Sequence, residues 1–208
     1  MSSTVEKRVV QSAGYTLFVL FLINFLNFFD RFLPGVVLEP IRKEFGLTDT
    51  MSGALGTAFI LIYAIAGIPL GRLADRMKRT HILGYGVAAW SLATAASGMV
   101  SNFMGLLFAR LAVGIGEASC APAGNSMIGD LYPSHRRARA LGLFMLGLPL
   151  GSLACFALGG WIAQNYGWRA AFFIAAAPGL IVAVLAWRLV EPVRGVQDKA
   201  ASTPLASN

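Results

Sequence analysis

Two charged residues, Arg110 and Glu117, stand inside a run of apolar residues that covers about positions 103–128. A run of this length can cross a hydrocarbon layer of ~30 Å as one helix. One such charge at mid-bilayer costs at least ~2.5 kcal/mol, so both side chains should face protein or trapped water. Arg110 and Glu117 share one face of the helix, because seven residues make about two turns. They are ~10.5 Å apart along the axis, which is too far for direct pairing, so each needs a partner elsewhere. They form either a structural charge pair that fixes helix packing or a transport or proton-relay site, and we favour the second.

Asp30 and Arg31 are a second charged pair of neighbours, in the apolar run at positions 14–38. Adjacent helical residues point ~100° apart, so these two cannot face the same wall. Pro34 and Gly35 follow them and should loosen the end of the helix. Two interpretations stay open: an ion pair at the helix end near the far interface, or a pair that lines a pathway.

The composition is that of a polytopic membrane protein. The chain is 56% hydrophobic and 13% charged, and its mean hydropathy is +0.65, whereas soluble domains carry roughly a quarter charged residues. A net charge of +7 could suggest nucleic acid, but the basic residues lie at the ends of apolar runs, where they orient helices in a membrane. We therefore expect a lipid bilayer as partner and no nucleic acid. The two cysteines, Cys120 and Cys155, lie within apolar runs and are expected to be small core residues.

Six apolar runs predict an all-α membrane protein with six transmembrane helices. The first run is too long for a signal-peptide core and lacks a cleavage pattern, so we interpret it as a retained span. Pro122 should bend the fourth. The spans are predicted at about residues 14–38, 51–70, 82–100, 103–128, 140–163 and 170–190.

The spans set the domain organisation. Residues 1–13 form a polar amino-terminal segment, residues 14–190 the six-helix transmembrane domain, and residues 191–208 a disordered tail or linker rich in Ala, Ser, Thr and Pro. Residues 39–50 are expected as a short polar loop and residues 130–139 as a basic loop. His81 and His135 lie beside basic loops and are expected at the membrane interface rather than as metal ligands.

Lysine and arginine are unevenly distributed between the two sides of this topology. Six spans put both termini on one side, and the excess of basic residues in short loops marks that side as cytoplasmic. We therefore predict an integral, multi-pass protein of the plasma (inner) membrane with both termini in the cytoplasm. One face carries Lys7, Arg8, Arg72, Arg76, Lys78, Arg79, Arg136, Arg137, Arg139, Arg188, Arg194 and Lys199, and the other carries only Arg42, Lys43 and Arg169.

Small residues spaced four apart favour close helix packing in a membrane. Gly67 with Gly71 and Gly147 with Gly151 have this spacing. Such seams serve helix packing alone, or they slide during transport.

Two motifs resemble the major facilitator superfamily. G-R-L-A-D-R-M-K-R, which begins at Gly71, is similar to that family's loop between the second and third helices, and R-L-A-V-G-I-G-E-A, which begins at Arg110, is similar to its fourth-helix motif. Lys78, where most members have glycine, and Thr80 depart from the pattern. F-F-D-R ending at Arg31, G-I-G-E-A-S and E-P-V-R-G resemble the spinster-like branch, and the organic-anion/proton symporter branch shares some of these elements.

The resemblance implies one six-helix half of the major facilitator fold, a 3+3 inverted repeat, whose intact members have twelve helices with the pathway between two halves. It implies alternating access, with a lysolipid or other amphipathic anion as substrate and a hydrophilic organic anion as runner-up. Asp30 and Glu117 would be protonatable or polar groups of the substrate-binding or proton-coupling site, and Arg31 and Arg110 their counter-charges or those of an anionic substrate.

The basic loop is a candidate cytoplasmic gate, made of Gly71, Asp75, Arg76 and Arg79. Asp75 stands at a helix end, where it can pair with arginines or a helix terminus and latch this side shut. The alternative is an orientation signal only.

A different class of function stays open. The chain could be a truncated or non-transporting six-helix membrane protein that acts only by pairing with a second half or with another copy of itself. The sequence holds no nucleotide-binding loop, metal-ligand cluster or nucleophile–base set, which argues against an enzyme, a cofactor and a metal.

Overall fold

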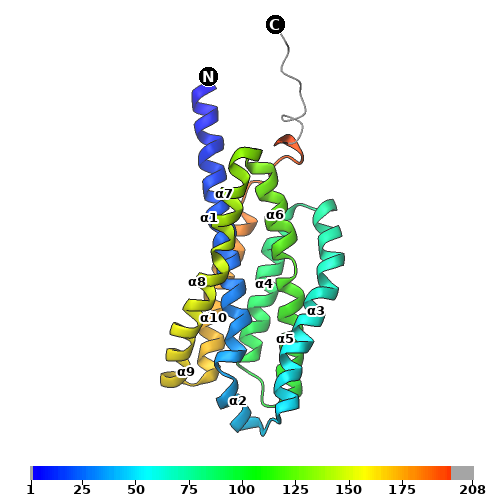
Figure 1. Cartoon of the computed structure of the whole chain (residues 1–208), viewed down its shortest axis with the longest axis vertical. Helices are drawn as coiled ribbons and strands as arrows, with labels where there is room; N and C mark the ends of the chain where they lie inside the picture. Colours follow the sequence, from blue (N-terminus) through cyan, green and yellow to red (C-terminus); the bar gives the residue numbers. More distant parts are fainter. Residues whose placement is uncertain (1, 198–208) are drawn as a thin grey trace.

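The computed structural model describes the backbone of residues 2–197 and the side chains from residue 13 to residue 197. This part of the chain is helical and contains no strand, as expected for an all-α membrane protein. Its helices run side by side along the long axis of the molecule (Figure 1). They are α1 (Ser2–Val36), α2 (Leu38–Phe45), α3 (Asp49–Arg76), α4 (Arg79–Ser97), α5 (Phe103–Glu117), α6 (Cys120–Leu131), α7 (Ser134–Met145), α8 (Gly147–Ala154), a π-helical turn η1 (Cys155–Gly159), α9 (Gly160–Tyr166) and α10 (Trp168–Trp187).

These elements form six long helical rods, because α5 continues into α6 and α7 continues through α8 and η1 into α9. Five of the six rods are long and apolar enough to cross a membrane by length and composition. The five are Ala13–Val36, Asp49–Arg76, Phe103–Leu131, Ser134–Tyr166 and Trp168–Trp187. The sixth rod is α4, which packs against α5 and α10. It buries Ser91, Thr94 and Ser97 against its neighbours, and these polar side chains make its composition less apolar. The predicted count of six is consistent with this bundle.

Two helices end at or next to the residue four positions before a proline. A proline lacks an N–H and its ring clashes with that carbonyl. Pro122 lies four residues after Ala118, where α5 gives way to α6, and Pro149 lies four residues after Met145, the last residue of α7. The expected bend at Pro122 is therefore present.

Three predicted loops are wrong in detail. Most of residues 39–50 lie in the short helix α2 or at the start of α3. Residues 130–139 are mainly helical: a short turn at Tyr132 and Pro133 separates α6 from α7, which carries Arg136, Arg137 and Arg139. The tail predicted to be disordered from Glu191 is ordered as far as residue 197, because it is bonded to the ends of α3, α4 and α6; the rest of the predicted tail lies outside the described residues.

The two glycine pairs behave differently. A Cβ on Gly147 would lie 2.8 Å from the backbone nitrogen of Phe25, and one on Gly151 would meet the Phe25 carbonyl, so these glycines let α8 touch the backbone of α1. A Cβ on Gly67 would meet nothing within 4 Å. The packing prediction is confirmed for the second pair and wrong for Gly67, because no described neighbour approaches that face of α3.

The two ends of the bundle differ in charge. The basic end carries the α3–α4 turn, the α6–α7 turn and the ordered tail, and the opposite end carries α2 and the α9–α10 turn (Figure 1). At the opposite end Arg169 donates to Glu44 Oε1 at 2.6 Å and to the Val100 carbonyl at 3.1 Å. Hydrogen bonds from the side chains of Arg169 and Trp168 lower the pKa of Glu44 to about 2.

Candidate functional site

Polar residues recur along one face of α1 where its surroundings are otherwise apolar. Asn24, Asn27 and Asp30 follow one another at three-residue spacing, and all three are buried. Two apolar clusters of the core meet along this stretch, one packed on residues 17–26 of α1 and the other on α1 from Phe29 onward. The charged site therefore lies between two apolar clusters of the bundle.

Arg31 of α1 makes an ion pair with Glu117 of α5. Its Nε and Nη2 donate to Glu117 Oε2 at 3.2 and 3.1 Å, and Nη2 also donates to Asn27 Oδ1 at 3.1 Å. The Glu117 side chain is fully buried, whereas that of Arg31 is 24% exposed. No ion pair between Asp30 and Arg31 themselves is present among the described contacts.

Aromatic rings of α3 cover the Arg31 guanidinium. Its carbon lies 4.4 Å from the ring centre of Tyr63 and 5.5 Å from that of Phe59, and 4.9 Å from that of Phe28 on its own helix. A cation over aromatic faces gains roughly 0.5–2 kcal/mol. Sequence reasoning missed Phe59 and Tyr63. Their four-residue spacing was the available signal, but it is equally typical of ordinary packing.

Arg110 approaches Asp30 through the backbone. Arg110 Nη2 donates to the Asp30 carbonyl oxygen at 3.2 Å, and Thr94 of α4 donates to Asp30 Oδ2 at 3.5 Å. Asp30 and Arg110 are 2% and 3% exposed. The structure thus brings all four predicted site residues into one buried region and adds Asn27 and Thr94.

Several polar atoms in this region have no hydrogen-bond partner among the described residues. They are Asp30 Oδ1, Arg110 Nη1, Glu117 Oε1 and Asn27 Nδ2. A buried polar atom without a partner costs about 1–3 kcal/mol. A functional site is one reason for a fold to keep such atoms.

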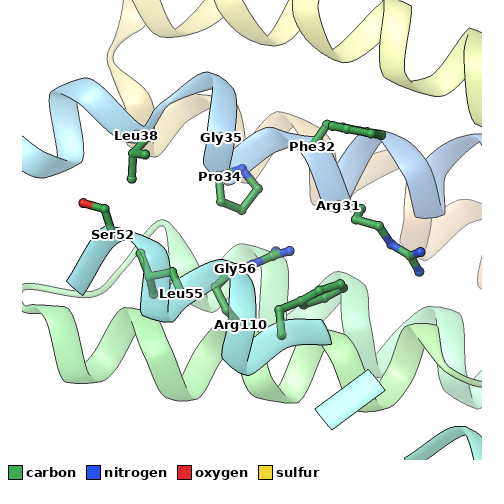
Figure 2. Close-up of a pocket in the computed structure, with 10 residues that line it drawn as sticks. Arg31, Phe32, Pro34, Gly35, Leu38, Ser52, Leu55, Gly56 and Arg110 are labelled. Atoms are coloured by element: carbon green, nitrogen blue, oxygen red, sulfur yellow. The ribbon is translucent and has the colours of Figure 1, made fainter. Parts of the chain in front are cut away.

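A pocket of about 220 Å³ borders the two arginines between α1 and α3. Figure 2 shows Arg31 and Arg110 together at this pocket, while Pro34 and Leu38 point toward α3. Its walls are otherwise mainly apolar and include Leu55. The arrangement suits a ligand with a negatively charged group and an apolar body.

Arg79 is the centre of a second charge cluster, at the basic end. Its side chain is 1% exposed and is bonded on three sides: to Glu191 Oε1 at 2.7 Å, to Asp130 Oδ2 at 2.5 Å and to Ser126 Oγ at 2.8 Å. Its Nη2 also donates to the Pro192 carbonyl at 2.9 Å. Burial raises the pKa of Glu191, but hydrogen bonds from the Thr80 backbone N–H and the Arg79 side chain outweigh it and hold that pKa below its usual value.

The ordered tail also holds the end of α3. Arg194 donates to the backbone carbonyls of Ala74, Asp75 and Met77, and the Gly195 N–H donates to Asp130 Oδ1 at 2.8 Å. A cation at these carbonyls satisfies acceptors that a helix end leaves open. Sequence reasoning missed Asp130, Glu191 and Arg194 as partners, since their contacts span 51 to 120 positions of chain.

The other candidate gate residues lie on the last turns of α3. Asp75 and Arg76 have exposed side chains, and Gly71 lies against α6, where an added Cβ would be 3.9 Å from Pro122. Arg79 differs from them, because its side chain is buried and paired with acidic residues. The structure therefore places the four residues at one end of the bundle but joins only Arg79 to a charge network.

The whole-chain comparison decides the family, because the chain matches the Major Facilitator Superfamily over residues 20–207. The chain belongs to this superfamily. It is 35% identical, over 187 residues, to an MFS-type efflux pump of Mycolicibacterium smegmatis, covering 89% of this chain and 43% of that protein. It is 34% identical, over 190 residues, to Protein spinster homolog 1 of Homo sapiens, covering 89% of this chain and 36% of that protein.

A solved relative has the same fold. The crystal structure of a bacterial homolog to the human lysosomal transporter Spinster, in an inward-facing and unoccupied conformation, superposes with a TM-score of 0.82 at 37% identity. The match covers 88% of this chain and 44% of that one. The chain thus spans less than half the length of these relatives, and it is spinster-like within the superfamily. The predicted fold and family resemblance are confirmed.

Proposed function

We propose that the chain forms the amino-terminal six-helix half of a secondary transporter that moves a small organic or amphipathic anion, such as a lysolipid, by alternating access coupled to protons. The observation that carries this proposal is the Arg31–Glu117 pair between α1 and α5, in which Glu117 is fully buried and Arg31 is partly exposed, beside polar atoms of Asp30 and Arg110 that have no described partner. Buried charges within a membrane bundle usually mark a pathway.

The anionic part of the substrate would bind at the arginines. Arg31 and Arg110 both line the 220 Å³ pocket, and Arg110 Nη1 has no hydrogen-bond partner among the described residues. The pocket is smaller than the ~300–1,000 Å³ usual for small-molecule sites. It would therefore form one wall of the site, and a second six-helix half or a second copy of the chain would supply the other.

The proton would be carried by Asp30 and Glu117. Each has one carboxylate oxygen without a described partner, and among the described residues only Arg31 donates to the other oxygen of Glu117. Whether the Glu117 carboxyl carries charge depends on how closely the guanidinium approaches it. A rearrangement that moves α1 against α5 would change that approach and so couple protonation to the conformation.

The gate would lie at the basic end, which we assign to the cytoplasm of an inner-membrane protein. Gly71, Asp75 and Arg76 would form its moving part, because the side chains of Asp75 and Arg76 are exposed. Arg79 would anchor it through Asp130 and Glu191. In a complete transporter, Asp75→Asn should change the uptake rate without changing membrane insertion; unchanged uptake and unchanged accessibility would leave the loop as an orientation signal.

The proposal is tested with the purified chain in liposomes under a pH gradient. Uptake of a labelled anionic lysolipid is measured beside its zwitterionic analogue and a hydrophilic dicarboxylate, with the oligomeric state determined in the same sample. Uptake should require a dimer or a separately supplied second half, and Glu117→Gln should abolish its dependence on the gradient.

The outcomes separate the parts of the proposal. Robust uptake by a demonstrated monomer would exclude the half-transporter. Uptake of the dicarboxylate alone would replace the amphipathic substrate by the hydrophilic one. Gradient-driven uptake unaffected by Glu117→Gln would remove Glu117 from coupling, with Glu44→Gln, at the opposite end, as the matched control.

A further inference from the structure

A second hollow lies on the surface of the bundle and shares no lining residue with the pocket at Arg31 and Arg110. It is a groove of about 340 Å³ between α3 and α4, with α5 as its floor. Its walls include Leu73 of α3, Met77 directly after α3, and Tyr85 of α4. We call these residues, with the floor described next, the α3–α4 groove.

Glycines make the floor of the groove. A Cβ on Gly116 of α5 would lie 2.9 Å from the carbonyl oxygen of Gly86 of α4, so the two helices touch where neither has a side chain. Beside this contact Tyr85 and Ile115 stand outward, 63% and 46% exposed. The close crossing between tall neighbours leaves a channel rather than a flat surface.

The length of the groove along α3 covers most of the thickness of one membrane leaflet. Its α3 wall extends from Leu70 to Met77, a rise of ~10 Å along the helix. Half of a hydrocarbon core is ~15 Å thick. The groove therefore begins at the basic end of the bundle and covers most of the acyl-chain depth of the leaflet there.

Cations stand at the mouth of the groove. Arg76 and Lys78 flank the groove residue Met77; both are exposed, and neither side chain has a hydrogen bond or ion pair to any described residue. His81 is also exposed and makes an edge-on ring contact with Tyr85 at 6.4 Å. Asp75 is the acidic residue of this turn, but at ~100° per residue it points about 160° away from the groove residue Leu73 on the same helix.

We propose that the α3–α4 groove binds an anionic phospholipid, with one acyl chain in the groove and the phosphate headgroup at Arg76 and Lys78. An apolar channel with a cationic mouth complements both the acyl chain and the negative charge of this ligand. Basic residues at a membrane surface attract anionic headgroups, and Tyr85 and His81 provide the amphipathic rings that favour the interface. The site is separate from the pocket at Arg31 and Arg110. It shares Arg76 with the proposed gate, but lipid binding is measured without transport and stands or falls independently of it.

The test is lipid binding by the purified full chain in mild detergent. Phosphatidylglycerol and phosphatidylcholine are titrated separately, and bound lipids are counted by native mass spectrometry. The tightest phosphatidylglycerol site should bind about tenfold or more tightly than any phosphatidylcholine site. Arg76→Gln/Lys78→Gln should remove that preference, and Ala112→Phe, which fills the groove from an exposed position of its floor, should weaken both lipids at this site.

Matched controls keep the result specific. Arg136→Gln/Arg139→Gln removes the same charge from exposed positions of α7, and Ala177→Phe adds the same ring on an exposed face of α10; both should bind as the unmodified chain does. Equal binding of the two lipids, or an equal loss in the α7 variant, would overturn the proposal. Folding of each variant is checked by its thermal unfolding.

Cross-linking in the native membrane identifies the occupant directly. A photoreactive maleimide on Ala112→Cys reports what fills the groove, and the native Cys120 and Cys155 are buried and should not compete. Adducts with phospholipid support the site. Adducts with protein, whether a second copy or another chain, would show that the groove is a protein interface and overturn the lipid assignment.

Discussion

Arg31 and Glu117 are 86 positions apart in the chain, yet they form an ion pair of 3.1 Å that joins α1 to α5. The two partners are not equivalent. Glu117 is fully enclosed, whereas Arg31 is partly exposed among aromatic rings. The carboxylate therefore depends on this pair for compensation of its charge, while the guanidinium has other favourable contacts.

This asymmetry predicts a double-mutant result. Arg31→Gln should lower the free energy of unfolding by about 3 kcal/mol, because a buried carboxylate loses its counter-charge. Arg31→Gln/Glu117→Gln should regain part of that loss, with a coupling of about 1–3 kcal/mol. Denaturation in mixed micelles measures the cycle. The exposed pair Arg42–Asp49 is the control and should show less than about 1 kcal/mol; equal coupling in the two cycles would contradict the prediction.

The cluster around Arg79 should contribute to stability. Arg79→Gln leaves Asp130 and Glu191 without their shared cation and should cost about 3 kcal/mol, the low end for a broken buried pair, since their side chains keep 12% and 21% exposure. Proteolysis of the ordered tail should also accelerate. Arg72→Gln, at an exposed position, is the control, and a loss as large in this variant would argue against a specific role for Arg79.

The two glycine pairs give opposite expectations. Gly147→Ala should cost about 1–3 kcal/mol, because its Cβ would press on the backbone of Phe25, which cannot move aside. Gly67→Ala should leave the stability of the chain unchanged or slightly higher, since nothing lies within 4 Å and alanine favours helix. Thermal unfolding of the two variants decides the matter, and destabilisation by Gly67→Ala would show that its face is covered.

The hydrogen bonds from Arg169 and Trp168 to Glu44 should make the stability of the chain depend on pH in the acidic range. The Arg169 and Trp168 side chains lower the folded-state pKa of Glu44 to about 2, below the ~4.3 of a free glutamate. Its contribution should be complete above about pH 4.3 and be lost as the pH falls toward 2. Melting temperatures between pH 6 and pH 2 should fall less steeply for Glu44→Gln than for Glu39→Gln, whose carboxylate contacts Lys43 at the surface. Parallel curves would refute the assignment.

Topology can be tested with introduced cysteines. Because basic residues are concentrated at one end, Ser3→Cys and Ser207→Cys should resist an impermeant maleimide added outside intact cells. Lys43→Cys, at the opposite end and exposed, should react. The buried native cysteines should give little background. Efficient labelling of either terminal position would reverse the orientation.

The sequence by itself determined the class of fold, its helical rods and the presence of buried charge. Hydropathy and helix breaks are local properties, so the runs around Asp30 and Glu117 could be read as spans, and Pro122 as a break, without knowing any neighbour. Motifs at Gly71 and Arg110 likewise indicated the family, because each is contiguous in the chain.

Only the tertiary structure decided which groups meet. Glu117 pairs with Arg31 rather than Arg110, and Arg79 is enclosed by Asp130 and Glu191. Likewise Gly147, but not Gly67, touches a neighbouring backbone. Helical spacing gives the face on which a side chain lies but not the helix that covers that face. That choice depends on how the rods pack, and the free energy of packing is shared among residues far apart in the chain.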